Sequence, residues 1–259
     1  MAETRTSVAG RPAWVDLSTE DPAAARDFYA KLFGWDIQVT EDPQYGGYAL
    51  AKVGGQDVAG IGPKQIPDAP NVWAVYIGSD DPEQLVERVN QAGGTVIAPP
   101  FDVGDQGRMG VFQDPTGAVV CAWQPRQMGA FHSGAANTFG WAELNARGVD
   151  KALPFYEAVF GWSVKKSPMG DGPQYNEFQL DGQSVAGAME MNEMVPNDVP
   201  SHWLVYFAVD DVDRAFSTAK DAGARELLAP MDFPGGRFAV LGDPQGAAFG
   251  LLRMSGGGA

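Results

Sequence analysis

Cysteine and histidine are scarce: the 259 residues contain only Cys121, His132 and His202. A single cysteine excludes an intrachain disulfide and a cysteine-rich zinc site. The two histidines give no spacing typical of a Ser-His-Asp or Cys-His catalytic arrangement. No glycine-rich phosphate loop or dinucleotide fingerprint follows a predicted strand. These absences exclude the commonest nucleophilic and nucleotide-binding sites.

Basic residues are also few, with 18 Lys and Arg against 33 Asp and Glu, a net charge of −15. A field of that sign repels phosphate backbones and anionic lipid headgroups, so we expect no nucleic-acid and no membrane partner. The sequence lacks an apolar run of the roughly 18 residues that a spanning helix needs, and its start lacks a hydrophobic signal region. We therefore expect a cytoplasmic protein, with non-classical export left open.

An internal repeat organises the chain. The segment that begins at Trp14 recurs from Trp141, and Phe28-Tyr29 matches Phe155-Tyr156 at an offset of 127 residues. Asp114-Pro115 matches Asp243-Pro244 at an offset of 129, a drift that small loop insertions explain. Matches of this kind over most of the chain indicate two homologous halves.

Each half divides again into two units of the same order. Asp21 and Pro22 predict the start of a helix, and Gly34 predicts its end, with strands before and after it. The same strand-helix-strand-strand-strand order returns from Val72, so the chain is predicted to hold four βαβββ units. We expect domains at 12–125 and 139–253, a linker at 126–138, and flexible ends at 1–11 and 254–259.

The repeated segments resemble the vicinal-oxygen-chelate superfamily of glyoxalases, bleomycin-resistance proteins and extradiol dioxygenases. The resemblance lies in Phe28-Tyr29, Phe33-Gly34-Trp35, Asp114-Pro115-Thr116-Gly117 and their second-half counterparts. It implies an α+β fold in which four βαβββ units form two tandem glyoxalase-like domains with curled mixed sheets. Within the superfamily the chain is similar to tandem two-domain actinobacterial proteins, which include a mycobacterial antigen of about this size and hydroxylases of polyketide clusters.

The resemblance also implies a divalent metal held by His and Glu, but the corresponding positions here carry other residues. They are Trp14, Gly60–Gly62, Trp73 or Ala74, and Cys121 in the first half, and Trp141, Gly187–Met189, Trp203 or Leu204, and Gly250 in the second. Indole, glycine and leucine do not ligate metals, and one cysteine is too few for a catalytic site. We therefore expect no metal and no other cofactor. A set of His202 with Glu143, Glu177 or Glu190, or an all-carboxylate site, stays open.

Strand alternation predicts which side chains face the concave side of each sheet. Val15 and Leu17 suit the core, so Trp14 and Asp16 are expected on the concave side, as are their counterparts Trp141 and Glu143. The same alternation adds the following candidate ligand-binding residues: Tyr76, Asn145, Leu204 and Tyr206. Asp16 and Glu143 are the candidate catalytic groups, and Arg108 and Arg237 either anchor a ligand or neutralise these acids.

Three functions remain open from the sequence. The first is metal-independent binding of a hydrophobic or aromatic small molecule, for sequestration, resistance or an accessory role in secondary metabolism. The second is an enzyme: a lyase of α-dicarbonyls such as methylglyoxal, or a polyketide hydroxylase or isomerase with Asp16 or Glu143 as general base. The third is a surface interaction protein.

The second half is expected to be the more specialised, because the Met-rich connection Met189–Pro200 suits the rim of an apolar site. Both monomer and homodimer are compatible with the sequence.

Overall fold

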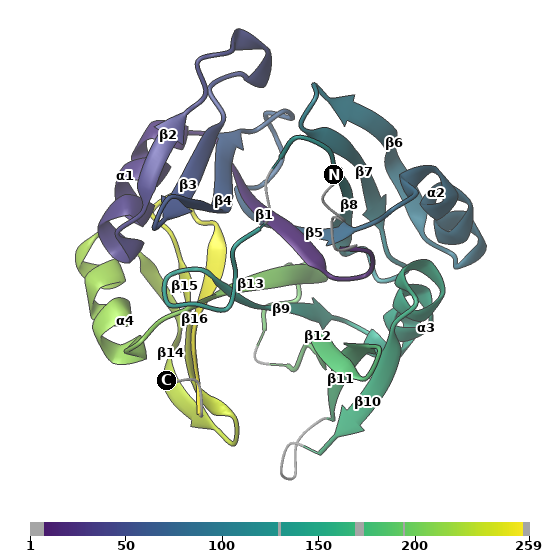
Figure 1. Cartoon of the computed structure of the whole chain (residues 1–259). Coiled ribbons are helices and arrows are strands. Elements are labelled where there is room, and N and C mark those ends of the chain that lie inside the picture. Colours follow the sequence, from purple (N-terminus) through teal and green to yellow (C-terminus); the bar gives the residue numbers. More distant parts are fainter. Residues whose placement is uncertain (1–7, 129–130, 169–173, 194, 256–259) are drawn as a thin grey trace. The chain divides into compact units, whose positions relative to one another are not determined.

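The computed structural model describes residues 8–128, 131–168, 174–193 and 195–255 (Figure 1). Each half of the chain consists of two βαβββ modules, which confirms the predicted fold. The first half contains β1 (Pro12–Thr19), α1 (Pro22–Phe33), β2 (Asp36–Val39), a 3₁₀ turn (Pro43–Tyr45), β3 (Ala49–Val53), β4 (Gln56–Pro63), β5 (Val72–Gly78), α2 (Pro82–Gln91), β6 (Thr95–Val103), β7 (Gly107–Gln113) and β8 (Val119–Pro125).

The second half repeats this order. It contains β9 (Phe139–Ala146), α3 (Val149–Phe160), β10 (Ser163–Ser167), β11 (Tyr175–Leu180), β12 (Gln183–Glu190), β13 (His202–Ala208), α4 (Val212–Asp221), β14 (Arg225–Phe233), β15 (Gly236–Gly242) and β16 (Ala248–Met254). Strands of each half form one eight-stranded mixed sheet, in the orders β2-β3-β4-β1-β5-β8-β7-β6 and β10-β11-β12-β9-β13-β16-β15-β14. None of the helices in the described residues is long and apolar enough to cross a membrane.

The chain divides into two compact units that combine modules from different halves. Unit 1 comprises the described parts of Met1–Trp14, Val75–Gly129 and Ala142–Trp203, so that it holds most of the modules β5–β8 and β9–β12. Unit 2 comprises the described parts of Val15–Ala74, Ala130–Trp141 and Leu204–Ala259, so that it holds most of the modules β1–β4 and β13–β16.

The first helix of each half begins in a different way. In α1, Oδ1 of Asp21 accepts hydrogen bonds from the amides of Ala23 and Ala24, at 3.1 and 3.0 Å. In α3, Gly148 occupies the corresponding place, and the carboxylate of Glu190 accepts from the amides of Gly148 and Val149, at 2.8 and 2.7 Å. Both arrangements satisfy amides that a helix leaves unpaired, and both place a negative charge at the positive end of the helix dipole.

A buried hydrogen-bonded chain joins two modules inside each unit. In unit 2, Trp73 Nε1 donates to Tyr29 Oη at 2.9 Å, and Tyr29 Oη donates to Asp243 Oδ2 at 3.1 Å. In unit 1, the same chain runs from Trp203 through Tyr156 to Asp114, at 2.8 and 3.0 Å. The tyrosine comes from one half of the sequence and the aspartate from the other. Burial raises the pKa of both tyrosines well above 10.0.

Candidate functional site

One face of the β13–β16 module, in unit 2, is apolar and partly open. Leu204, Tyr206 and Leu252 are buried at its centre, and partly buried hydrophobic side chains pack around them. We call this set the apolar face; it consists of Trp141, Leu204, Tyr206, Phe233, Phe238, Val240, Ala248 and Leu252. The structure thus brings together three residues that the sequence singled out, namely Trp141, Leu204 and Tyr206.

Strand register explains how the apolar face forms. Tyr206 pairs with Gly250, and Phe238 pairs with Leu252, so all four residues point to the same side of the sheet. The ring of Phe238 packs edge-to-face against Tyr206 and Phe233, with ring centroids 6.2 and 5.7 Å apart. Helix α1 covers the opposite side, because Phe28 contacts Phe249. The apolar face is therefore the side of this module that lies away from α1.

A second group of candidate residues lies on β9, in unit 1. Glu143 is only 8% exposed, while Asn145 is half-buried on the same side of the strand. Leu144 and Ala146 are completely buried on the other side. The register places Glu143 opposite Gly187 on β12. A carboxylate in such a protected position is expected to affect the choice of ligand or the chemistry of the site.

Asp16, the counterpart of Glu143, lies in unit 2 beside a tyrosine. Tyr48 Oη donates to Asp16 Oδ2 at 3.3 Å, and the Tyr48 ring covers two glycines of β4. A Cβ atom on Gly60 would lie 1.7 Å from Tyr48 Oη, and one on Gly62 would lie 2.8 Å from Tyr48 Cδ2. The ring therefore fills the space that a metal-binding side chain would need at these positions.

The other two aromatic candidates of the first half, Trp14 and Tyr76, are both largely buried, at 3% and 7% exposure. Tyr76 pairs with Cys121 in the β5–β8 register, and its ring contacts Trp123 edge-to-face at 6.4 Å. Cys121 is itself buried, as expected for a small hydrophobic side chain on a strand.

Arg108 and Arg237 form surface ion pairs. Arg108 binds Glu83 and Asp102, and its hydrogen bond to Asp102 lowers the pKa of that carboxyl group. Arg237 binds Asp213 and Asp232 in the same way, which lowers the pKa of Asp213. These contacts give no support to the interpretation that the arginines neutralise Asp16 and Glu143. Their role as ligand anchors stays a prediction.

The residues present do not fit the divalent metal that the resemblance implies. In the described parts of the chain, His, Cys, Asp and Glu side chains form no group of three or more that would hold a metal ion. At two of the expected ligand positions, Gly60 and Gly250, a tyrosine ring occupies the space above the backbone. A Cβ atom on Gly250 would lie 2.0 Å from Tyr206 Cδ1.

The alternative set around His202 is also not assembled as a metal site. Glu190 is engaged at the start of α3, and Glu177 binds Lys165 and Ser184. His202 Nδ1 lies 2.9 Å from the carbonyl oxygen of Pro200. These three side chains therefore have other structural contacts.

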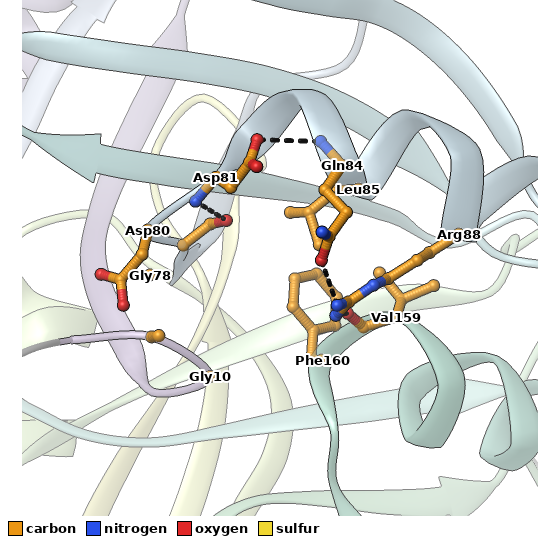
Figure 2. A pocket seen from close by; sticks show the side chains of 11 residues that line it. Gly10, Gly78, Asp80, Asp81, Gln84, Leu85, Arg88, Val159 and Phe160 are labelled. Carbon is orange, nitrogen blue, oxygen red and sulfur yellow. Dashed lines mark hydrogen bonds between the residues drawn. The ribbon is translucent and has the colours of Figure 1, made fainter.

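A cleft in unit 1 lies apart from the predicted site residues. It has a volume of about 200 Å³ and lies between residues 9–10, the start of α2 and the end of α3 (Figure 2). Asp81 accepts a hydrogen bond from the Gln84 amide, and Arg88 binds the Gln84 side chain across the lining. Asp81, Gln84 and Arg88 therefore have hydrogen-bond partners within the lining of the cleft.

Two tandem halves, each built from two βαβββ modules around one mixed sheet, define a class of protein, and comparison with known families agrees. The family model for the Glyoxalase/Bleomycin resistance protein/Dioxygenase superfamily matches residues 11–122 and 138–251. The chain belongs to this superfamily.

Relatives match over nearly their whole length. The chain is 43% identical over 251 residues to a Mycobacterium tuberculosis protein named "Putative glyoxylase CFP32", covering 94% of this chain and 95% of the relative. It is 37% identical over 260 residues to the anthracycline biosynthesis protein DnrV of Streptomyces peucetius, covering 95% and 94%. These relatives share the tandem organisation, because each alignment spans both halves.

Solved structures of the same fold are more distant in sequence. The Mn(II)-bound glyoxalase from Novosphingobium aromaticivorans matches with a TM-score of 0.66 at 18% identity, over 95% of this chain and 83% of that one. The 2,3-dioxygenase LapB from Pseudomonas sp. KL28 matches with a TM-score of 0.66 at 14% identity, over 95% and 92%. At such identities these similarities show the fold alone.

Sequence reasoning missed two kinds of residue. Tyr48 was assigned only to a strand, although its counterpart Tyr175 lies at the same offset of 127 as the neighbouring matches. Phe233 and Phe238 were missed because they lie on β14 and β15, which are not the strands that the resemblance associates with metal ligands. Reading the alternation of β14 and β15 would have found Phe233 and Phe238.

Proposed function

We propose that the protein binds a hydrophobic, aromatic small molecule on the apolar face of unit 2 and needs no metal to do so. The observation that carries this proposal is the cluster itself, in which Trp141, Phe233, Phe238 and Val240 remain partly exposed. Aromatic side chains that are only partly covered suit a planar ligand, because stacking and edge contacts add to the hydrophobic gain.

The proposal that no metal is needed rests on which residue types occupy the family's metal-ligand positions in this chain. Tryptophan and glycine occupy most of them, and tyrosine rings lie over Gly60 and Gly250. Restoring a histidine at either glycine would require the ring to move. Binding is therefore expected to depend on packing and hydrogen bonds.

The named relatives favour an aromatic ligand. DnrV is described as an anthracycline biosynthesis protein, and anthracyclines contain fused aromatic rings. A role in sequestration, resistance or secondary metabolism fits a protein that binds such a molecule. The glyoxylase name of the mycobacterial relative supports an enzymatic alternative.

That alternative is general-base catalysis by Glu143 or Asp16. Glu143 is 92% buried, and Asp16 accepts a hydrogen bond from Tyr48. The reaction would be that of a lyase acting on an α-dicarbonyl such as methylglyoxal, or of a hydroxylase or isomerase acting on a polyketide. Loss of turnover in Glu143→Gln or Asp16→Asn, with ligand binding intact, would favour it over binding alone.

Binding is tested with 9-anthracenemethanol, a neutral planar probe, by calorimetric titration in buffer with and without EDTA. Phe238→Ala should weaken binding at least about tenfold, because its partly exposed ring packs against the buried Tyr206 of the apolar face. Phe101→Ala, which removes an exposed phenylalanine from β6, is the matched control and should leave affinity unchanged. No detectable binding to the wild type, or loss of binding in EDTA, would contradict the proposal.

A further inference from the structure

Arg147, directly after β9 in unit 1, is a partly buried cation that forms no ion pair with the residues that the structure describes. Its Nη2 donates to the carbonyl oxygens of Val195 and Pro196, at 3.1 and 2.7 Å. Its Nε is buried and has no hydrogen-bond partner within the described residues. In a chain with a net charge of −15, a guanidinium that binds only neutral carbonyls is unexpected.

Asn145, two residues earlier, presents a second unmatched donor. Its Nδ2 is buried and lacks a partner among the described residues. Asn145 lies on the same side of β9 as Glu143, opposite the fully buried Leu144 and Ala146. An unpaired buried N–H reduces stability, so an acceptor that reached both donors would be favoured there.

Two acidic side chains of the same module, Glu190 and Glu177, are engaged elsewhere. Glu190 binds the backbone amides of Gly148 and Val149, and Glu177 binds Lys165 and Ser184. The backbone of Arg147 is also fixed, because its amide donates to Ser201 Oγ at 3.1 Å. The Val195 and Pro196 carbonyls therefore hold the guanidinium in place, while the carboxylate of Glu190 binds the start of α3.

The first half lacks this pair of donors. At the offset of 127 residues, Ser18 corresponds to Asn145 and Glu20 corresponds to Arg147. A positive charge in one repeat is therefore a negative charge in the other. The two donors are a feature of the second half alone and are not required by the βαβββ fold.

We propose that Asn145 and Arg147 form a binding subsite for the carboxylate of a small organic acid. Arg147 Nε and Asn145 Nδ2 donate to the carboxylate oxygens, and the guanidinium supplies the opposite charge. The subsite goes beyond the proposed function, since its argument uses neither the apolar face nor the absence of a metal.

The test compares anthracene-9-carboxylate with 9-anthracenemethanol, which has the same ring system without the charge. Calorimetric titration of the wild type should show at least about tenfold tighter binding of the carboxylate, as expected for charge-assisted hydrogen bonds. Arg147→Gln should reduce this ratio to about one, and Arg147→Lys should restore part of it because the charge remains. Salt at 1 M should also reduce the ratio.

Arg214→Gln is the matched control, since it removes the same charge from an exposed arginine of α4. It should leave the ratio unchanged. Asn145→Leu should reduce the ratio and keep or raise the midpoint of thermal unfolding, because it removes an unpaired buried donor. A loss of stability in Asn145→Leu would mean that the amide is structural and would count against the subsite.

The outcomes separate the two proposals. Equal binding of both probes to the wild type would overturn the subsite and leave the apolar face intact. Preference for the carboxylate that survives in Arg147→Gln would also overturn it. If neither probe binds, both proposals fail; if only the carboxylate binds and Arg147 is required, the subsite stands and the proposed binding of neutral aromatic molecules fails.

Discussion

The modules β1–β4 and β9–β12 occupy equivalent places in the repeat. They differ in the residues on the side of the strands that faces away from the helix. In β1–β4, the Tyr48 ring lies over Gly60 and Gly62 and its hydroxyl binds Asp16. In β9–β12, Met189 replaces Gly62, a position at which a Cβ in the first half would lie 2.8 Å from Tyr48 Cδ2. The repeat conserves the strands and helices, while the polar face has diverged.

The other two modules differ in the same way. Tyr206 lies against Gly250 in β13–β16, while its counterpart Tyr76 pairs with Cys121 in β5–β8. Because Cys121 has a Cβ atom and Gly250 does not, the two tyrosines cannot contact their partner strands identically. One glycine thus allows the close packing on which the apolar face depends.

The largest effect on stability is expected from Gly250→Cys, which places in the second half the residue type that the first half has at Cys121. Its Cβ would lie 2.0 Å from a ring atom of the buried Tyr206, so the ring must move. We expect a loss of about 2–3 kcal/mol in the free energy of unfolding, measured with urea, together with weaker binding of 9-anthracenemethanol. The reverse change, Cys121→Gly, should cost less; equal costs would show that the two modules pack alike.

A smaller effect is expected from breaking the tyrosine chains in each unit. Tyr29→Phe and Tyr156→Phe each leave a buried tryptophan N–H and a carboxylate oxygen without their partner, which costs about 1–3 kcal/mol. Asp114 keeps an additional bond from Thr116 Oγ1, at 2.7 Å. Tyr156→Phe should therefore destabilise less than Tyr29→Phe in urea unfolding. The opposite order would contradict this comparison of the units.

The same tyrosines predict how stability depends on pH. Burial raises the pKa of Tyr29 and Tyr156 well above 10.0, so above that pH these residues stay protonated when folded and ionise when unfolded. The folded state then holds more protons, and the free energy of unfolding must fall as the pH rises above about 10. Urea titrations between pH 8 and about pH 11 should show this fall, and a Tyr29→Phe/Tyr156→Phe double variant should show a shallower one.

The smallest effect is expected from the paired surface arginines. Arg108→Gln and Arg237→Gln remove exposed ion pairs, which salt screens. We expect slight losses of stability that disappear in 1 M salt and unchanged affinity for anthracene-9-carboxylate. A marked loss of affinity in either variant would instead assign that arginine to ligand binding.

Much of the fold was predictable from local chemistry. Helix α1 begins at Pro22, after Asp21, and ends before Gly34, as the capping preferences of these residues predict. The offset of 127 residues predicts the equivalent helix in the second half. Strand β6 extends through Pro99 and Pro100, because an edge strand tolerates proline. Side-chain alternation correctly placed Leu204 and Tyr206 on one side of β13.

The pairing of modules and the polar contacts were not predictable in the same way. The two halves carry equivalent tyrosines and aspartates, so the sequence alone does not say whether Tyr29 binds Asp114 or Asp243. The contact of Glu190 with the start of α3 arises because a glycine, and not an aspartate, occupies the position before the first residue of that helix. Such features arise from tertiary packing, which repeats and spacing do not encode locally.

The crossed tyrosine–aspartate bonds make the halves of the chain interdependent. Tyr29 of the first half completes unit 2 with Asp243, and Tyr156 of the second half completes unit 1 with Asp114. Each half therefore supplies half of the core of both units. A protease that cut the chain once between the repeats would release no separate domain, because the fragments would stay interlocked as a complementing pair. The protein would thus resist separation by a single cut because each half contributes to both units, and the linker itself would need no extra stability.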